Sequence, residues 1–86
     1  MADYSIVFAR SASKELEALG DTTLTRVFDR IERLAIDPRP SGIRKLRGSE
    51  NLWRLRVGDY RVIYAVDDKN RLVDIIAIRH RRDAYR

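Results

Sequence analysis

The sequence predicts an α+β fold, with an N-terminal strand and an antiparallel helix hairpin packed on one face of a four-stranded, mainly antiparallel β-sheet. After a short initial strand, apolar residues recur at helical spacing up to about residue 36. From residue 43 onward, apolar and polar residues alternate as they do in strands. The chain has 86 residues and no stretch long enough for a linker, so we expect a single domain over residues 1–86.

The first half of the chain carries a strand and two helices. Residues 4–8 alternate in the manner of a strand. Ser11 is expected to cap a helix that runs to about Leu19, and Asp21 to cap a second helix that Asp37-Pro38 ends. The tight link at residues 20–21 predicts that the two helices lie antiparallel. Their buried faces are expected to contain Ala12, Leu16, Leu19, Leu24, Val27, Phe28, Ile31, Leu34 and Ala35.

The second half of the chain is expected to consist of strands joined by short loops. Gly58-Asp59 is a two-residue turn signal between alternating segments, which favours a tight hairpin. Residues 67–71 are expected to form a five-residue hairpin loop, in which Asn70 can adopt a positive φ. Residues 81–86 are expected to add a turn of helix. The predicted strands span residues 44–46, 52–57, 60–66 and 72–79.

The hairpin at Gly58-Asp59 sets two arginines against each other. If the turn has two residues, Val57 pairs with Tyr60, and Arg56 then lies directly opposite Arg61. Such a pair repels by a few tenths of a kcal/mol or more. A sheet selected only for stability would not contain it, so the pair indicates a role in binding.

The next hairpin extends this arginine face to a third strand. A five-residue loop pairs Val66 with Leu72, which places Arg61 opposite Ala77 with Arg79 on the diagonal. Converging arginines with no carboxylate among them favour a phosphate-binding groove. A solvated polar face is the alternative, and a β-bulge would turn part of a strand over. The residues expected on this face are Arg54, Arg56, Arg61 and Arg79, with Ala65 and Ala77 between them.

The opposite face of the sheet is expected to receive the helix hairpin. Asp74 also falls on this face, which requires either a position at its rim or a different register. The apolar residues expected there are Trp53, Leu55, Tyr60, Val62, Tyr64, Val66, Leu72, Ile76 and Ile78.

The net charge of +5 is concentrated in the second half of the chain. Residues 1–40 contain 6 Lys or Arg and 7 Asp or Glu, whereas residues 41–86 contain 12 and 6. Ten of these twelve cations are arginine, whose planar fork of donors suits phosphate.

The composition also bears on cofactors and on location. With no cysteine, one histidine and no acidic cluster of metal-binding spacing, we expect no metal and no cofactor. We find no leader and no run of about 18 apolar residues, so we expect a cytoplasmic protein that does not bind a membrane.

The last residues form a basic segment that carries His80 and Tyr85. Histidine titrates near neutral pH, which makes His80 a candidate for proton transfer. Strict alternation places His80 on the face opposite Arg79, and a structural role is the alternative. Tyr85 could stack on a base, take part in proton transfer, or pin the tail to the core.

Four pieces of the sequence follow the strand and helix pair in a recognisable order. They are Lys45-Leu46-Arg47-Gly48, Leu52-Trp53-Arg54-Leu55-Arg56, Gly58-Asp59-Tyr60-Arg61-Val62-Ile63-Tyr64, and the tail from Arg79 to Tyr85. Together they resemble the RelE/ParE superfamily of type II toxin–antitoxin toxins, over the whole chain. Members of the RelE branch are ribosome-dependent ribonucleases that cut mRNA in the ribosomal A site, by attack of the ribose 2′-OH on the neighbouring phosphate. The resemblance therefore implies a RelE-like fold and a metal-independent mRNA endoribonuclease.

The resemblance also implies roles for individual residues. Arg54 and Arg56 match basic positions on the central strands, and Arg61 matches the arginine of a Tyr-Arg motif. Near the end, Arg79 and Tyr85 match a basic and an aromatic site residue, whereas the residue at the position of His80 differs between branches. The catalytic candidates are therefore Arg61, Arg79, His80 and Tyr85, and the RNA- and phosphate-binding candidates are Arg54, Arg56, Arg81, Lys45 and Arg47.

Partners follow from the same resemblance. Superfamily toxins are held inactive by an antitoxin encoded beside them, so we expect an acidic, RelB-like antitoxin that covers basic and apolar surface. The ribosome and the mRNA in its A site are the other expected partners.

Two other functions stay open. A ParE-like toxin would inhibit DNA gyrase, and assays of translation and of supercoiling separate the two. A non-catalytic RNA- or ribosome-binding module would bind message without cutting it. Single-strand binders usually place aromatic residues on the binding face, whereas Trp53, Tyr60 and Tyr64 are expected in the core.

Overall fold

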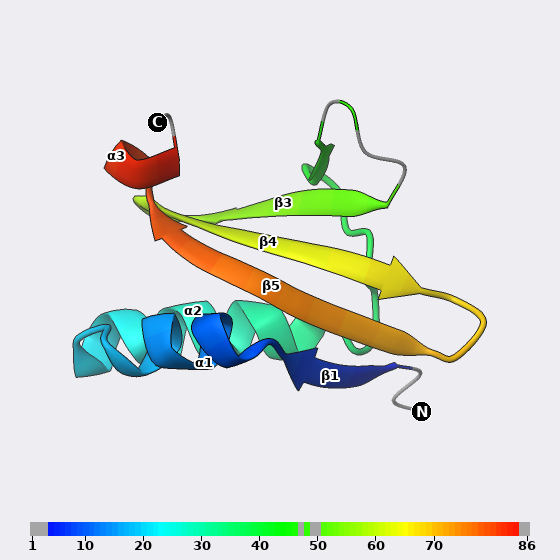
Figure 1. Cartoon of the computed structure of the whole chain (residues 1–86), viewed down its shortest axis with the longest axis horizontal. Helices are drawn as coiled ribbons and strands as arrows, with labels where there is room; N and C mark the ends of the chain where they lie inside the picture. Colours follow the sequence, from blue (N-terminus) through cyan, green and yellow to red (C-terminus); the bar gives the residue numbers. More distant parts are fainter. Residues whose placement is uncertain (1–3, 47, 49–50, 85–86) are drawn as a thin grey trace.

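A mixed five-stranded sheet lies over two helices in the computed structural model, which describes residues 4–46, 48 and 51–84 (Figure 1). The strand order is β1-β5-β4-β3-β2, with β1 parallel to β5 and the other neighbours antiparallel. The predicted α+β class and the helices on one face are confirmed, while the N-terminal strand joins the sheet as a fifth strand. The elements are β1 (Ser5–Phe8), α1 (Arg10–Glu17), α2 (Asp21–Arg33), β2 (Arg44–Lys45), β3 (Leu52–Val57), β4 (Tyr60–Asp67), β5 (Leu72–His80) and α3 (Arg81–Ala84).

Neither of the two long helices is capped as predicted. The residue before α1 is Ala9 and the residue before α2 is Gly20, and neither provides a side-chain cap. Ser11 and Asp21 lie inside the first turn of their helices, so both predicted caps are wrong. Asp21 still contributes there, because a carboxylate near a helix N-terminus is favourable. Both helices also end a few residues before their predicted limits.

The core lies between the helices and the facing side of the sheet. From the predicted stripe of α2, Val27, Ile31 and Leu34 are fully buried, whereas Phe28 is partly exposed. Burying an aliphatic side chain of this size contributes about 1.5–3 kcal/mol. The other buried members of the core are Ala12, Leu55, Val57, Val62, Tyr64, Val66, Val73, Ile75 and Ile78.

The hairpin between β3 and β4 has the predicted register. Val57 pairs with Tyr60, and Arg56 lies directly opposite Arg61. Gly58 has a φ of 59°, a left-handed conformation that glycine adopts at no steric cost. The two-residue turn thus aligns the central strands as the sequence indicates.

The register between β4 and β5 differs from the prediction. Asp67 rather than Val66 pairs with Leu72, so the loop has four residues, and Arg71 rather than Asn70 has the positive φ, at 58°. A bulge then shifts the pairing by one more residue, because Tyr64 pairs with Ile75 and Ile63 with Ala77. The extra residue of β5 is Ile76.

This correction changes which residues of β5 face the helices. Val73 and Ile75 enter the core in place of the predicted Leu72 and Ile76, while Ile78 stays in the core as predicted. Asp74 turns to the opposite face and is exposed, which removes the conflict that the predicted register created. Arg79 lies directly opposite Arg61 and not on its diagonal.

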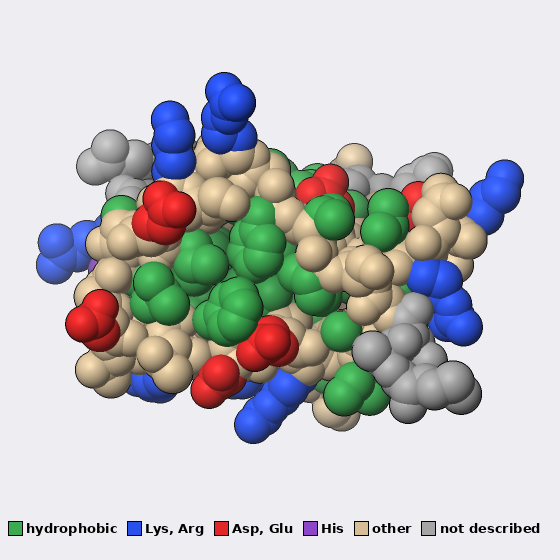
Figure 2. All heavy atoms as spheres, turned by 90° about the horizontal axis from the view of Figure 1, so that it is seen from below, with side chains coloured by type: hydrophobic (Ala, Val, Ile, Leu, Met, Phe, Trp, Pro, Cys, Tyr) green, Lys and Arg blue, Asp and Glu red, His purple; other side chains and the backbone are tan. Residues whose placement is uncertain are grey.

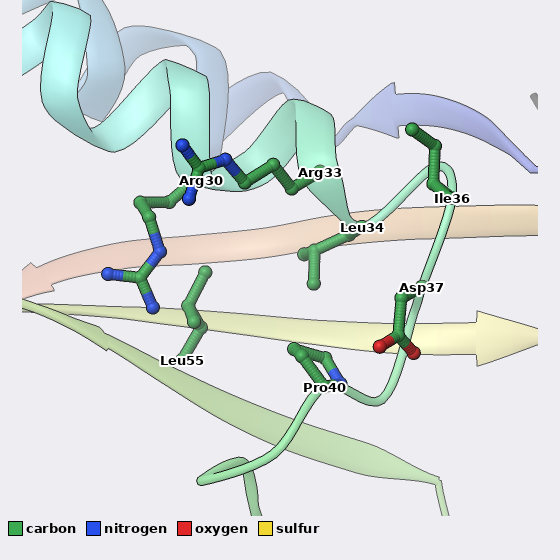
Figure 3. Close-up of a pocket in the computed structure, with 7 residues that line it drawn as sticks. All are labelled: Arg30, Arg33, Leu34, Ile36, Asp37, Pro40 and Leu55. Carbon is green, nitrogen blue, oxygen red and sulfur yellow. The ribbon is translucent and has the colours of Figure 1, made fainter.

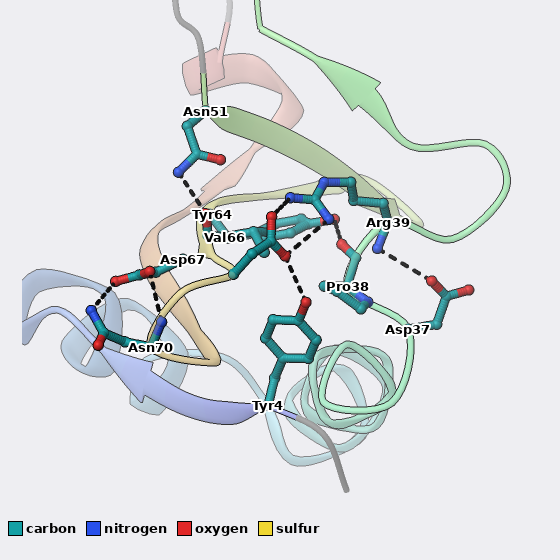
Figure 4. Close-up of polar contacts among 10 residues, drawn as sticks. Tyr4, Asp37, Pro38, Arg39, Asn51, Tyr64, Val66, Asp67 and Asn70 are labelled. Carbon is teal, nitrogen blue, oxygen red and sulfur yellow. Dashed lines mark hydrogen bonds and ion pairs between the residues drawn. The ribbon is translucent and has the colours of Figure 1, made fainter.

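A cluster of polar contacts ties the loop after α2 to the sheet (Figure 4). Arg39 donates from both terminal nitrogens to Asp68, at 3.3 and 2.7 Å, and the Tyr4 hydroxyl donates to the same carboxylate at 2.6 Å. These hydrogen bonds hold the pKa of the Asp68 carboxyl below its usual value, and those from Arg39 have the largest effect. Deeper inside, the Tyr64 hydroxyl donates to the carbonyl of Pro38 at 2.7 Å, and burial raises the pKa of Tyr64 to about 12. The loop that leads to β2 is therefore fixed at two points.

Candidate functional site

Four arginines surround a hollow on the sheet face that points away from the helices. This arginine hollow has a volume of about 310 Å³ and is lined by Gly42, Arg44, Arg54, Arg56 and Arg61. Arg44 lies opposite Arg54 across β2 and β3, and Arg56 lies opposite Arg61 across β3 and β4. Regular strand pairing therefore anchors all four side chains on a rigid backbone.

The arginine hollow concentrates positive charge. Arg61 is only 5% exposed, so its charge acts in surroundings of lower dielectric than water. Within the described ranges, no carboxylate lies within 4.0 Å of the guanidinium groups of Arg44, Arg54 or Arg56. Arg56 donates from Nε to the carbonyl of Gly58 over a long 3.5 Å. Arginines without a carboxylate partner suit an anion with several oxygens, such as a phosphate group.

Arg79 lies opposite Arg61 but does not line the hollow. Its Nε is 2.9 Å from Oε2 of Glu15 on α1, so the predicted absence of carboxylates from the arginine face is wrong here. Asp74 is a second carboxylate on this face, opposite Ala65 at the far end of the strands. The structure thus brings three of the four predicted arginines together and leaves Arg79 at the outer edge of β5.

His80 lies on the other face of the sheet, as strict alternation predicts. It is opposite Tyr60, and the two rings meet edge to face with their centres 5.2 Å apart. Its Nδ1 accepts the backbone N–H of Arg82 at 3.3 Å. These contacts hold the start of α3 against the end of the sheet, away from the arginine hollow.

The remaining candidates are dispersed. Lys45 lies opposite Trp53, with its Nζ 5.9 Å from the centre of the indole ring. It does not line the arginine hollow, but it borders a second hollow with Arg44, Leu46 and Arg54. The guanidinium of Arg81 is 4.0 Å from the Asp59 carboxylate at the exposed turn. Two predicted site residues lie outside the described residues, namely Arg47 and Tyr85.

Sequence reasoning missed Gly42 and Arg44. The signal for Arg44 is alternation, because Lys45 faces Trp53 on the core side and its neighbour must then face Arg54. Finding it requires the register between β2 and β3. The connection between these strands is longer than a tight turn, so its length does not determine that register.

An apolar groove lies between α2 and β3 on the helix side of the sheet. It has a volume of about 370 Å³, and Figure 3 shows Leu34, Leu55 and Pro40 directed into it. Ile36 at its border is 69% exposed. Apolar side chains also gather at the centre of the face seen from the helix side (Figure 2). The groove is lined by Arg30, Arg33, Leu34, Ile36, Asp37, Pro40 and Leu55.

Two further observations concern the described part of the chain. It contains no group of three or more His, Cys, Asp or Glu side chains that could hold a metal ion. None of its helices combines the length and the apolar character needed to cross a bilayer.

Comparisons with known proteins agree with one another. The family described as the ParE toxin of type II toxin–antitoxin system, parDE, matches residues 6–85. The toxin RelE of Mycobacterium tuberculosis is 31% identical over 84 residues, which cover 96% of this chain and 87% of that protein. The RelE–RelB complex of Pyrococcus horikoshii OT3 contains a chain with 30% identity and a TM-score of 0.82, over 92% of this chain and 96% of that chain. The intact E. coli RelBE toxin–antitoxin complex gives 27% identity and a TM-score of 0.78, over 87% and 93%.

Proposed function

The chain belongs to the ParE toxin family of type II toxin–antitoxin systems, as a RelE-like member of the RelE/ParE superfamily, and on this premise we propose that it is a ribosome-dependent endoribonuclease. Its substrate is mRNA in the ribosomal A site, and the cut proceeds by attack of a ribose 2′-OH on the neighbouring phosphate. The arginine hollow is the observation that supports this proposal. Because its substrate is on ribosomes, the toxin acts in the cytoplasm.

The hollow suits the charge that this reaction develops. In-line attack concentrates negative charge on the phosphate oxygens in the transition state. Arg54, Arg56 and Arg61, with Arg44 added, are proposed to bind the phosphate group and to stabilise that charge. Arg79, which lies opposite Arg61 at the edge of the hollow, is proposed to assist them. Donors already held by paired strands need no reorganisation, and each contributes typically a few kcal/mol.

Proton transfer needs a different kind of group. Arginine does not give up its proton at ordinary pH, so the hollow alone would cut free RNA slowly. We assign proton transfer or base stacking to Tyr85, and we assign to His80 the support of the sheet end through its contact with Tyr60. The ribosome would supply the alignment of the 2′-OH with the phosphate that the small site lacks.

The test is growth inhibition together with mapping of mRNA 5′ ends after brief induction. Arg54→Ala and Arg61→Ala should each lower cleavage about a hundredfold or more. Because Arg61 is buried, Arg61→Lys is the second variant at that position, with circular dichroism to confirm folding. The matched control is Arg10→Ala, which removes an exposed arginine at the start of α1. Full cleavage by a folded Arg54→Ala/Arg61→Lys variant would refute the site.

We further propose that an acidic, RelB-like antitoxin encoded alongside neutralises the toxin. The apolar groove fits an amphipathic segment, because Leu34 and Leu55 can receive apolar side chains while Arg30 and Arg33 attract carboxylates (Figure 3). Ile36→Asp should then weaken neutralisation by the product of the adjacent gene while leaving toxicity intact. Unchanged neutralisation would place the contact elsewhere.

A second candidate function follows from the matched family itself, which is that of ParE toxins. In this case the chain would inhibit DNA gyrase instead of cutting mRNA. Purified protein that blocks supercoiling by gyrase, and leaves cell-free translation unaffected, would establish this alternative. Inhibited translation with normal supercoiling supports the nuclease.

A further inference from the structure

Glu15 lies beside the part of β5 that extends past its pairing with β1. β1 pairs with β5 only over the first four residues of β5, so no strand of the described residues lies beside the rest of that edge. There Oε1 of Glu15 accepts the backbone N–H of Ile78 at 2.9 Å. Oε2 of the same carboxylate is 2.9 Å from Nε of Arg79. The Glu15 carboxylate therefore binds the backbone of Ile78 and the side chain of Arg79.

The backbone contact alone does not explain a charged residue here. A buried or half-buried N–H needs an acceptor, and a glutamine at position 15 would provide one equally well. Glu15 also lies in the last turn of α1, where a carboxylate is disfavoured by the helix dipole. The negative charge of Glu15 is thus unfavourable for the helix itself, and we attribute its presence to the ion pair with Arg79.

Arg79 needs a restraint because of its neighbours. Arg56, Arg61 and Arg79 stand in a row across β3, β4 and β5. Like charges in such a row repel, and the side chain of Arg79, which is 48% exposed, would otherwise swing into solvent. Pairing through Nε anchors the guanidinium at the edge while its two terminal nitrogens remain available as donors.

We infer that Glu15 is a positioning residue that holds Arg79 beside the arginine hollow for its part in RNA cleavage. The inference rests on the function proposed above and adds to it a residue of α1 outside the sheet. Preorganisation of this kind raises the rate of the chemical step, because Arg79 is already ordered before the transition state forms.

The test is a double-mutant cycle of ribosome-dependent cleavage with the wild type, Glu15→Gln, Arg79→Ala and the double variant. Glu15→Gln keeps an acceptor for Ile78 and removes the charge that binds Arg79. It should lower kcat between about tenfold and a hundredfold, leave KM for programmed ribosomes unchanged, and cause no further loss in the Arg79→Ala background. Glu17→Gln is the matched control, since it removes an exposed carboxylate from the same helix, and it should leave kcat unchanged.

Three outcomes of these cleavage assays would overturn the inference. If Glu15→Gln cleaves as fast as the wild type, or lowers kcat equally with and without Arg79, Glu15 serves the fold alone and the nuclease proposal still stands. If the wild type does not cleave ribosome-bound mRNA, the proposed function fails and the inference fails with it.

A measurement on the unmodified protein guards against a variant that does not fold. The Nε hydrogen of Arg79 should exchange with water more slowly than that of the exposed Arg82, as observed by NMR. Equal exchange rates would show that the pairing with Glu15 does not restrain Arg79 and would overturn the inference.

Discussion

Removal of a single hydroxyl group tests how the arginine hollow is supported. Tyr64 is fully buried, and its hydroxyl donates to the carbonyl of Pro38 at 2.7 Å. Pro38 belongs to the loop that continues through Gly42 to Arg44, which line the hollow. Tyr64→Phe keeps the ring in the core and removes only this bond, so its effect reports the bond itself.

The expected loss follows from the geometry. A neutral hydrogen bond contributes roughly 0.5–1.5 kcal/mol net, and a buried partner left without its donor costs about 1–3 kcal/mol. We expect Tyr64→Phe to lower the free energy of unfolding by about 2 kcal/mol. In a domain of this size, that loss lowers Tm by roughly 8–16 °C.

Thermal and urea unfolding of the variant measure this loss. The control is Tyr60→Phe, because the hydroxyl of Tyr60 forms no hydrogen bond with any residue that the structure describes. Tyr60→Phe should change Tm little. If both variants lose the same amount, the bond to Pro38 contributes nothing and the reasoning is wrong.

The same residue gives a test at alkaline pH. Burial raises the pKa of Tyr64 to about 12 from the ordinary value of 10.0, so between these values only the unfolded chain ionises. The contribution of Tyr64 to the free energy of unfolding is complete below pH 10 and is lost as pH rises toward 12. The stability advantage of the wild type over Tyr64→Phe should therefore shrink, by up to about 1.4 kcal/mol per pH unit.

Three further predictions concern other parts of the molecule. The pKa of Asp68 is held below 3.8, chiefly by Arg39, so its contribution to stability is present above that pH and is lost as pH falls through the lowered pKa. Asp68→Asn should therefore lower Tm at pH 7, and its difference from the wild type should shrink in acid. Gly58→Ala should lower stability in urea by about 1–2 kcal/mol because φ is positive there, and Gly58→Asn should lose less. Arg44→Ala should weaken binding of single-stranded RNA and reduce the slope of log K against log salt by about 0.7; an unchanged slope would remove Arg44 from the phosphate contacts.

The central hairpin could be predicted from the sequence because its turn determines its register. Gly58-Asp59 allows only two residues in the loop, so the positions of Arg56 and Arg61 follow by counting. The loop before β5 is longer, and its length is compatible with several registers. The bulge at Ile76 lies within the apolar run of residues 75–78, so alternation does not locate it. The misplaced Asp74 was the one sign that the predicted register was wrong.

The candidate site could be predicted only where a tight turn determines the register. Arg54, Arg56 and Arg61 share a face because β3 and β4 share a tight turn, whereas Arg44 depends on a strand of two residues that pairs across a longer connection. The pairing of Arg79 with Glu15 joins residues 64 positions apart, on a helix and a strand. No local pattern in the sequence indicates that contact.

The parallel pairing of β1 with β5 affects the order in which the molecule forms. Ser5 pairs with Leu72, so nearly the whole chain is synthesised before the first strand has anything to pair with. The β3–β4 hairpin depends on contacts between near neighbours in the sequence and can form earlier. A nascent toxin is therefore expected to display its arginines before it has a complete core, and docking of the first strand on the last should be the step that completes folding.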